Sequence, residues 1–461
     1  MEVLQGSGLI YSAVVPFLWF TNPFFVFQAT RPMYECIEVI GKGPLSGIVP
    51  AGGAKNAALP LLMATLLTDE PVKLTNVPAL EDITHVRQLL ESLGSVMDYH
   101  QGTVTIQTKE IVRRSASHSL VKALRASFWI LAPLLARCGE AQISLPGGDI
   151  IGARPVDIHI EALTAMGASI ELKHGIVVAS APHGLRPAHI TFRYPSVGAT
   201  HQILMAAARV PGTTVIEGAA REPEIEAMAD LLTRMGAEVE GAGTSTISIT
   251  GTSHPTGASL HLIGDRIEAG TYLCAGVATR GLVTVEGIRP HHVGKLLDIF
   301  EEIGCTVQKL ENSIVIDAGR ELRGVSVATG PFPELATDLQ APLLAALCTI
   351  PGESVIEETV YEARFRHVAE LWRLGAQIEL SDRSARITGV PRLSGAAVEG
   401  HDIRAAASLV VAGLAADGST FISEPNHLRR GYEHLEEKIT ALGGTIFNRI
   451  ADAEDIMFTG C

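Results

Sequence analysis

A phrase of helix, glycine and strand recurs six times along this chain. Each copy is an apolar helical pattern ending in Leu-Gly, Met-Gly or Ile-Gly, followed by a small residue and a strand pattern. Successive copies lie 73, 69, 68, 71 and 68 residues apart, and so regular a period is typical of a repeat architecture. The residue after a helix often adopts the left-handed conformation, which suits glycine. The six glycines are Gly94, Gly167, Gly236, Gly304, Gly375 and Gly443.

Each repeat also contains an apolar helix, a strand and a turn before the helix that ends at the glycine. This alternation predicts an α/β fold, with sheets outside buried helices or the reverse. The first helix of each unit is apolar almost all round, which indicates an interior position. Because six units do not suit one core, we expect two lobes of three units, formed by residues 36–54 with 264–461 and by residues 55–263. The chain should cross between the lobes near Gly53 and Gly264.

Charge and motif content exclude several classes of function. The chain carries 50 acidic and 36 basic residues, for a net charge of −14, which argues against a general nucleic-acid or anionic-membrane surface. Neither a P-loop nor a dinucleotide-binding glycine motif occurs, and no Ser-centred nucleophile elbow is present. An anionic ligand must therefore be held by a local basic pocket.

The six cysteines are scattered and form no C-x-x-C pair. Neither a disulfide framework nor a zinc site has this spacing. We therefore expect mostly buried, reduced thiols, no metal site and a cytoplasmic protein.

The N-terminal segment stands apart from the rest of the chain. Residues 3–30 carry no charge, and seven aromatic residues fall between Tyr11 and Phe27. Three interpretations stay open: a start assigned too far upstream or a disordered extension, a membrane or targeting element, or a structured part of the fold. Pro16, Pro23 and the lack of a preceding basic residue argue against a membrane span or signal peptide. We treat residues 1–35 as an extension and expect no membrane contact for the folded core.

Polar residues mark the start of each interior helix. Helix N-termini carry free N–H groups and a positive dipole end, which favour anions. Arginines in the following loops add bidentate donors for phosphate or carboxylate, although any one of them could instead be a capping or surface ion-pair residue. A cleft between lobes is the expected ligand site. The helix-start residues are Lys55, Asn56, Arg125, Ser196, Val197, Gly198, Asp265, Arg266, Thr337, Asp338, Asp402, Ile403 and Arg404, and the loop arginines are Arg154, Arg221, Arg364 and Arg430.

Seven ordered motifs resemble those of the UDP-N-acetylglucosamine 1-carboxyvinyltransferases, an enolpyruvyl transferase family. The resemblance covers about residues 36 to 459 and implies a two-lobed inside-out α/β barrel, with buried helices, external sheets and three units in each lobe. The motifs are GGAKNAALP (52–60), LPGGDIIGARPVDIH (145–159), PSVGAT (195–200), AAREPEI (219–225), DRIEAGTYL (265–273), TDLQA (337–341) and RRGYE (429–433).

The resemblance implies transfer of the enolpyruvyl group of phosphoenolpyruvate to the 3-hydroxyl of UDP-N-acetylglucosamine, the first committed step of peptidoglycan synthesis, without a cofactor. Asp338 would be the base, and Asp149, on a mobile loop, the proton donor. Lys55, Arg154 and Arg430 would hold the phosphate and carboxylate, with Arg364 and Arg404 lining the same cleft. The implied contacts to the UDP-sugar are Asn56, Arg125, Arg154, Pro155, Val156, Asp157, Ile158, Ser196, Val197 and Val360.

Four residues depart from the family pattern. The family usually has a cysteine at Asp149, and that cysteine is alkylated by fosfomycin, so the aspartate implies resistance. Tyr194 replaces a lysine that often contacts the UDP group, Ala336 replaces a proline and Arg429 an aspartate. The alternatives are 5-enolpyruvylshikimate-3-phosphate synthase, a paralogue that acts on another nucleotide sugar, and a silent binding relative.

Overall fold

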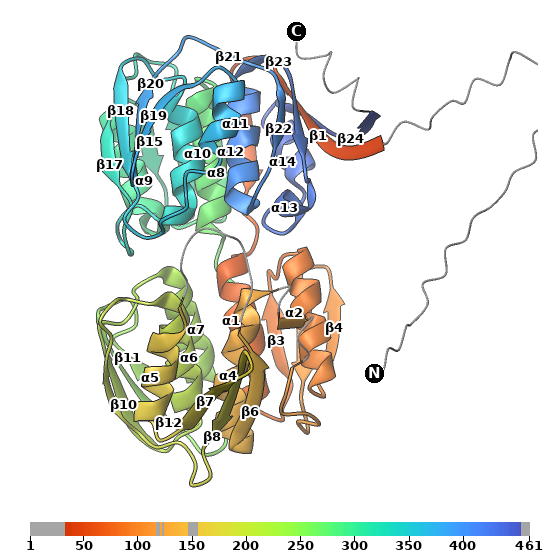
Figure 1. Cartoon of the computed structure of the whole chain (residues 1–461), viewed down its shortest axis with the longest axis vertical. Coiled ribbons are helices and arrows are strands. Elements are labelled where there is room, and N and C mark those ends of the chain that lie inside the picture. The colour runs from red at the N-terminus through yellow and green to blue at the C-terminus, as the bar shows by residue number, and fades with distance from the viewer. Residues whose placement is uncertain (1–32, 117–119, 122–123, 146–154, 453–461) are drawn as a thin grey trace, which may run out of the picture.

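Buried apolar side chains form two large clusters in the computed structural model, which describes residues 33–116, 120–121, 124–145 and 155–452. One cluster runs from Ala54 to Leu262, and the other takes residues 37–51 and 267–446. Figure 1 shows them as two lobes along the long axis of the molecule. We call the body around the first cluster the lower lobe and the body around the second the upper lobe.

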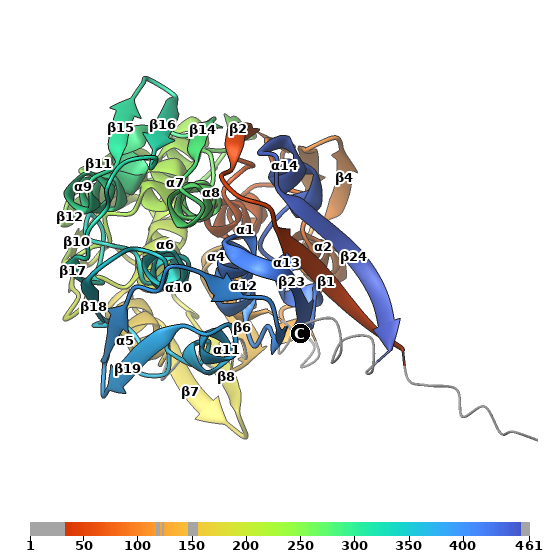
Figure 2. The same ribbon diagram turned by 90° about the horizontal axis from the view of Figure 1, so that it is seen from above.

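Three sheets surround each lobe in the described part of the chain, and Figure 2 shows the upper three around a group of helices. The lower sheets have the orders β13 (Ser259–His261)-β3 (Val72–Thr75)-β5 (Thr103–Gln107)-β4 (Val96–His100), β6 (Glu140–Ser144)-β8 (Ile176–Ser180)-β7 (Ser169–Lys173) and β11 (Glu238–Glu240)-β12 (Thr246–Gly251)-β10 (Gly212–Glu217)-β9 (His189–Thr191). The upper orders are β15 (Thr306–Lys309)-β16 (Ser313–Asp317)-β14 (Leu282–Glu286)-β2 (Ser46–Pro50), β17 (Ser326–Ala328)-β18 (Glu353–Glu357)-β20 (Ser384–Thr388)-β19 (Gln377–Ser381) and β21 (Leu393–Ser394)-β23 (Ala416–Ser423)-β1 (Met33–Gly41)-β24 (Thr445–Asp452), with β22 (Ala397–Glu399) also beside β23.

The strands alternate between a buried and an exposed face, as a sheet that covers a core requires. In β14, Val283 and Val285 are buried and lie opposite Ile316 and Ile314 of β16 in antiparallel register. Parallel pairs occur beside them, as where β14 meets β2. The result is a mixed α/β fold of six small sheets in the described chain.

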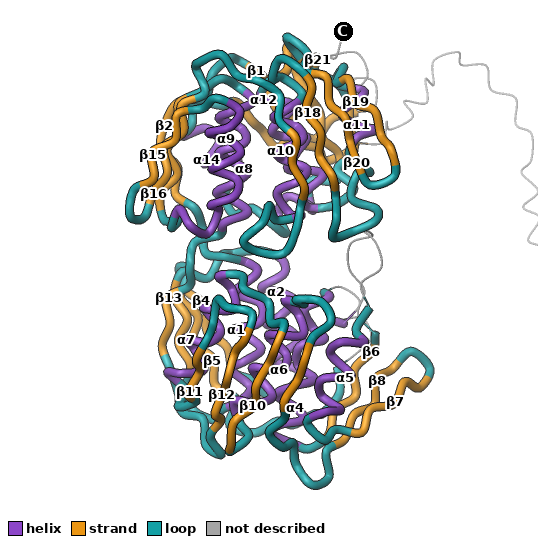
Figure 3. The backbone as a smooth tube through the Cα atoms, turned by 90° about the vertical axis from the view of Figure 1, so that its left-hand side faces the viewer, coloured by secondary structure: helices purple, strands orange, loops and turns teal. Residues whose placement is uncertain are grey.

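The first helix of each repeat lies inside its lobe, as Figure 3 shows. Every residue of α8 (Arg266–Ala278) and α12 (Ile403–Leu414) is buried, which confirms the predicted interior position for these helices. The other interior helices are α1 (Lys55–Ala64), α6 (Val197–Ala208) and α10 (Thr337–Leu347).

The second repeat differs from the single long helix that its sequence suggested. A 3₁₀ helix, η2 (Arg125–Ile130), precedes a short helix, α4 (Leu131–Cys138). Pro133 explains the break, because it has no N–H to continue an α-helical ladder and suits only the first turn of a new helix.

The helices that end at the repeat glycines pack with one apolar stripe inward. They are α2 (Glu81–Ser92), α5 (Asp157–Ala165), α7 (Pro223–Arg234), α9 (Gly294–Ile303), α11 (Val368–Arg373) and α14 (Leu435–Ala441). All six glycines after them have a positive φ, between 81° and 113°, which confirms the left-handed position predicted for each. The remaining helical turns are η1 (Thr65–Leu67), η3 (Pro290–Val293) and α13 (Asn426–Arg429).

The two lobes are joined where Gly53 and Gly264 form an isolated antiparallel bridge. A Cβ on Gly53 would lie 1.7 Å from the carbonyl oxygen of Asn76, so this crossing requires glycine. Asp265 fixes the helices on either side. One of its carboxylate oxygens caps α8, and the other accepts the backbone N–H of Lys55, the first residue of α1, at 3.0 Å.

The cysteines that the structure describes are free thiols. Cys36, Cys274, Cys305 and Cys348 are buried and Cys138 is half-buried, in line with the prediction of mostly buried, reduced thiols. Among the described residues, no helix has the length and apolar character needed to cross a bilayer.

Candidate active site

A cleft of about 620 Å³ lies between the lobes and is lined from both sides. Every described residue that the family resemblance assigns to catalysis or substrate binding lines it, although contact with substrate stays a prediction; Asp149 and Arg154 lie outside the described residues. Those lining residues are Lys55, Asn56, Arg125, Pro155, Val156, Asp157, Ile158, Ser196, Val197, Asp338, Val360, Arg364, Arg404 and Arg430.

One predicted arginine does not belong to this cleft. The Arg221 side chain is exposed and donates to the carbonyl oxygen of Gly243 at 3.2 Å. The expectation that it joins the other loop arginines was wrong, because its side chain bonds the neighbouring turn instead.

The interior helices present their N-terminal ends to this cleft. The first residue of each lines it: Lys55, Arg125, Val197, Arg266, Thr337 and Ile403. Side-chain caps set the geometry of three of these ends, and Asp265 supplies the cap of α8. Ser196 Oγ accepts the N–H of Ala199 at 3.2 Å, and Asp402 Oδ1 accepts the N–H of Arg404 at 2.8 Å. Several positive helix ends aimed at one cleft favour an anionic ligand.

Asp338 holds two arginines together at the start of α10. Its Oδ1 binds Arg364, and its Oδ2 accepts Arg404 Nη2 at 3.2 Å. Burial alone raises the pKa of Asp338, but the nearby guanidinium groups of Arg404 and Arg364 outweigh burial and hold its pKa well below the usual range. The carboxylate therefore stays ionised, and both arginine side chains remain fixed at the cleft wall.

A second carboxylate, Asp82 on α2, binds two further cations. Its Oδ2 lies 2.6 Å from Lys55 Nζ, and its Oδ1 accepts Arg430 Nε at 2.9 Å. Burial lowers the pKa of Lys55 below its usual value, and the negative charge of Asp82 offsets only part of that effect. The sequence did not single out Asp82, because an acid in the first turn of a helix has an ordinary role in stabilising the helix dipole.

Buried acids also surround Arg266 at the start of α8. Arg266 Nε donates to Glu224 Oε1 at 2.9 Å, with both side chains almost fully buried. Burial raises the pKa of Glu222, and Arg266 opposes that effect. Arg266 comes from the upper lobe and both glutamates from the lower lobe, so this group spans the cleft. The AAREPEI motif contains both glutamates, yet no residue in it was predicted as a cleft acid.

The lower-lobe wall combines aromatic rings with polar groups. Trp129 Nε1 donates to the carbonyl oxygen of Gly198 at 2.9 Å, and Asp157 pairs with Arg193. Beneath them, burial lowers the pKa of His159 to about 4, so that ring is neutral at physiological pH. This wall therefore combines an indole ring, an ion pair and a neutral imidazole.

The sequence matches the model of one protein family, described as EPSP synthase (3-phosphoshikimate 1-carboxyvinyltransferase), over residues 39–439. UDP-N-acetylglucosamine 1-carboxyvinyltransferase from Jannaschia sp. (strain CCS1) is 48% identical over 420 residues, which cover 90% of this chain and 99% of that protein. The enzyme of that name from Azorhizobium caulinodans is also 48% identical, over 421 residues, 89% of this chain and 98% of that protein.

Solved structures share the fold. The enolpyruvyl transferase NikO from Streptomyces tendae is similar with a TM-score of 0.81 and 26% identity, over 91% of this chain and 100% of that chain. EPSP synthase from Acinetobacter baumannii has a TM-score of 0.70 at 18% identity, over 90% of this chain and 100% of that chain, which shows the fold alone. The chain therefore belongs to the UDP-N-acetylglucosamine 1-carboxyvinyltransferases, within the EPSP synthase family of enolpyruvyl transferases.

Proposed function

We propose that this protein transfers the enolpyruvyl group of phosphoenolpyruvate to the 3-hydroxyl of UDP-N-acetylglucosamine and releases phosphate, as the first committed step of peptidoglycan synthesis. The observation that carries the proposal is the cation arrangement around Asp338. Arg364 and Arg404 bind this carboxylate, and Lys55 and Arg430 line the same cleft. Such fixed positive groups suit a substrate that carries both a phosphate and a carboxylate.

The reaction needs a proton on C3 of phosphoenolpyruvate while the sugar hydroxyl attacks C2. Preorganised cations stabilise the charge that develops, without reorganisation during the step. Asp338 accepts the hydroxyl proton as the new C–O bond forms. Loss of the C3 proton then restores the double bond as the C–O bond to phosphate breaks, so the enolpyruvyl ether and phosphate are the products.

Asp338 is a weak base while two guanidinium groups hold its pKa low. An anionic substrate that binds Arg364 and Arg404 would share their positive charge and so raise the pKa of the carboxylate. Binding of phosphoenolpyruvate would therefore activate the base at the moment the hydroxyl is in place. This coupling explains why the base and the anion-binding cations share one cluster.

We also propose that the chain is organised as an inside-out α/β barrel in each lobe, with residues 36–54 and 264–461 in one lobe and residues 55–263 in the other. The two separate buried clusters support this division. Since both proposed substrates are cytoplasmic metabolites, we place the enzyme in the cytoplasm.

The direct test is to incubate the purified chain with phosphoenolpyruvate and UDP-N-acetylglucosamine and to identify the nucleotide product by mass spectrometry. The expected product is the 3-O-enolpyruvyl ether, formed in equal amount with inorganic phosphate. Phosphate release without a modified nucleotide would contradict the proposal.

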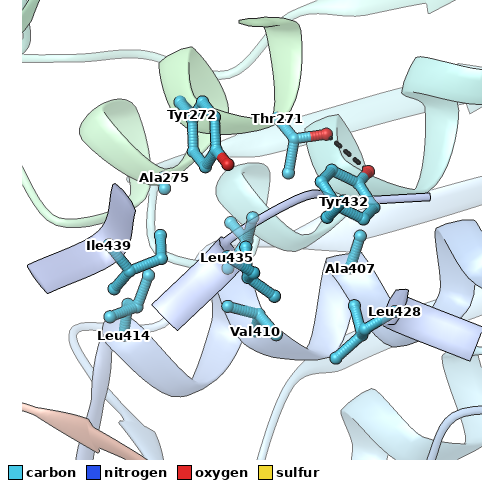
Figure 4. A pocket seen from close by; sticks show the side chains of 11 residues that line it. Thr271, Tyr272, Ala275, Ala407, Val410, Leu414, Leu428, Tyr432, Leu435 and Ile439 are labelled. Atoms are coloured by element: carbon cyan, nitrogen blue, oxygen red, sulfur yellow. Dashed lines mark hydrogen bonds between the residues drawn. The ribbon is translucent and has the colours of Figure 1, made fainter. Parts of the chain in front are cut away.

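Tyr432 supports Arg404 from behind the cleft, beside a small cavity of about 10 Å³ (Figure 4). Its hydroxyl lies 2.9 Å from Thr271 Oγ1 and accepts Arg404 Nη1 at 3.3 Å. Replacing Tyr432 by Phe keeps the ring and removes both bonds. We expect KM for phosphoenolpyruvate to rise about fivefold, which corresponds to about 1 kcal/mol for one hydrogen bond, with kcat little changed.

Thr271→Val is the matched control for this prediction, because it removes the threonine hydroxyl and leaves the bond from Tyr432 to Arg404. Steady-state kinetics should give this variant a KM within about twofold of the parent. Equal effects of the two variants would argue against support of Arg404 by Tyr432.

Asp149 predicts resistance to fosfomycin, a prediction that rests on the sequence since the residue lies outside the described ranges. A carboxylate opens an epoxide far less readily than a thiolate does. The parent should remain active after incubation with fosfomycin, and Asp149→Cys should be inactivated with time. In that variant the alkaline limb of activity should move to higher pH, because a thiol loses its proton at higher pH than a carboxyl group.

Intact-mass measurement checks the resistance, and a pH profile checks the role of Asp149 as proton donor. A fosfomycin adduct on Asp149 of the parent would contradict the nucleophilicity argument. An unchanged alkaline limb in Asp149→Cys would contradict the proton-donor role alone.

A further inference from the structure

Asp82 joins two cations that come from different lobes. It is the second residue of α2, in the lower lobe, and its side chain is only 1% exposed. Lys55 lies in the same lobe, at the start of α1, whereas Arg430 follows α13 in the upper lobe. The two carboxylate oxygens are divided between them, one for Lys55 Nζ and one for Arg430 Nε. The pairing therefore bridges the cleft at its buried wall.

The surroundings of Lys55 make this carboxylate important. The lysine side chain is nearly as buried as Asp82, and burial disfavours its charged form. Arg404 on α12 and Arg430 are close enough to repel its charge as well. Asp82 is the carboxylate whose attraction opposes all three effects, and the Asp265 carboxylate binds only the backbone N–H of Lys55.

We propose that Asp82 is a positioning residue for the phosphoenolpyruvate pocket: it keeps Lys55 protonated and draws Arg430 across the cleft to lie beside it. Both cations line the cleft in which the anionic substrate is proposed to bind. The inference rests on the proposed function for the identity of that anion, but the two pairings themselves do not depend on it.

This role differs from that of a purely structural ion pair. A purely structural ion pair would affect the stability of the protein and the binding of both substrates to a similar extent. A positioning role instead predicts that the loss falls on phosphoenolpyruvate, grows with rising pH and leaves UDP-N-acetylglucosamine binding in place.

The test uses Asp82→Asn in the full-length chain, which keeps the side-chain shape and removes the charge. Loss of an ion-pair partner should lower the pKa of Lys55 further, so the lysine becomes neutral at lower pH. KM for phosphoenolpyruvate should rise about tenfold or more near neutral pH and rise further toward pH 9. The dissociation constant for UDP-N-acetylglucosamine, measured by calorimetry, should stay within about twofold of the parent.

Glu433→Gln is the matched control. Glu433 Oε1 accepts the backbone N–H of Ala79 at 2.7 Å, so it also joins the two lobes, but among the described residues it forms no hydrogen bond or ion pair with Lys55. This variant should keep the KM of the parent for phosphoenolpyruvate across the pH range. An equal rise in KM for phosphoenolpyruvate in both variants would contradict the proposal, because Asp82 would then act only as a contact between the lobes.

Competitive acetylation of Lys55, followed by mass spectrometry, measures the pKa of the lysine without any need for turnover. An unchanged pKa in Asp82→Asn would overturn the proposal, as would a KM within about twofold of the parent from pH 6 to 9. If Asp82→Asn does not fold, the same labelling experiment on the parent protein tests the proposal. A Lys55 that titrates below pH 7 in the parent, where Asp82 is intact, would also overturn it. A parent that releases no phosphate from phosphoenolpyruvate refutes the proposed function, while the labelling result still tests Asp82.

Discussion

Asp338→Asn should lower kcat by about a hundred- to ten-thousandfold, the range that a lost general base costs, while UDP-N-acetylglucosamine still binds. The asparagine keeps the shape of the side chain at the start of α10 but cannot take a proton from the sugar hydroxyl. Arg404 and Arg364 hold the pKa of Asp338 low, so its carboxylate is ionised at every working pH. The loss should therefore be equally large at pH 6 and pH 9, as measured by phosphate release.

The same variant also removes a charge from two buried arginines, so part of the loss could come from displaced cations. Calorimetry with the sugar nucleotide and KM for phosphoenolpyruvate separate the two effects. Tyr432→Phe is the comparison, since it disturbs Arg404 without touching the proton acceptor. Turnover of Asp338→Asn within about tenfold of the parent would rule out its role as the base.

Glu224→Gln should destabilise the protein by about 3 kcal/mol, at the lower end of the cost of breaking a buried ion pair. The change leaves the Arg266 guanidinium buried between the lobes without its carboxylate partner. We expect the lower end because Glu222 also lies close enough to interact with Arg266. Urea denaturation monitored by circular dichroism measures the effect.

The matched control for this change is an exposed pair of the same chemistry. Asp230 and Arg234 lie one turn apart on α7 with both side chains about half exposed, and Asp230→Asn should cost no more than about 0.5 kcal/mol. If the two substitutions have similar costs, burial of the Glu224 pair contributes nothing to stability.

The repeat was predictable because its signals are local. A glycine with positive φ ends each outer helix, and an all-apolar helix must lie inside a core. Both features can be recognised from a few neighbouring residues. The break between η2 and α4 in the second repeat was not predicted, although Pro133 is present in the sequence. The residues on both sides of the break are apolar, so the pattern alone does not mark where one helix ends and the next begins.

The missed site residues depend on contacts between distant segments. Asp82 binds Arg430, 348 positions away in the chain, and nothing around either residue specifies that pairing. Arg221 shows the reverse error, since an arginine in an equivalent loop can bond a nearby turn as readily as it can face the cleft. Helix starts were easier to place, because the repeat itself orients them toward one end of each lobe.

The choice of acceptor distinguishes a UDP-N-acetylglucosamine 1-carboxyvinyltransferase from an enzyme that acts on shikimate 3-phosphate. Phosphate release from phosphoenolpyruvate should be measured with the parent chain and either UDP-N-acetylglucosamine or shikimate 3-phosphate. We predict rapid release with the UDP-sugar and only background release with shikimate 3-phosphate, because Ser196, Val197 and Asp157, which line the cleft, are proposed to contact the UDP-sugar. Faster release with shikimate 3-phosphate, or none with UDP-N-acetylglucosamine, would contradict it.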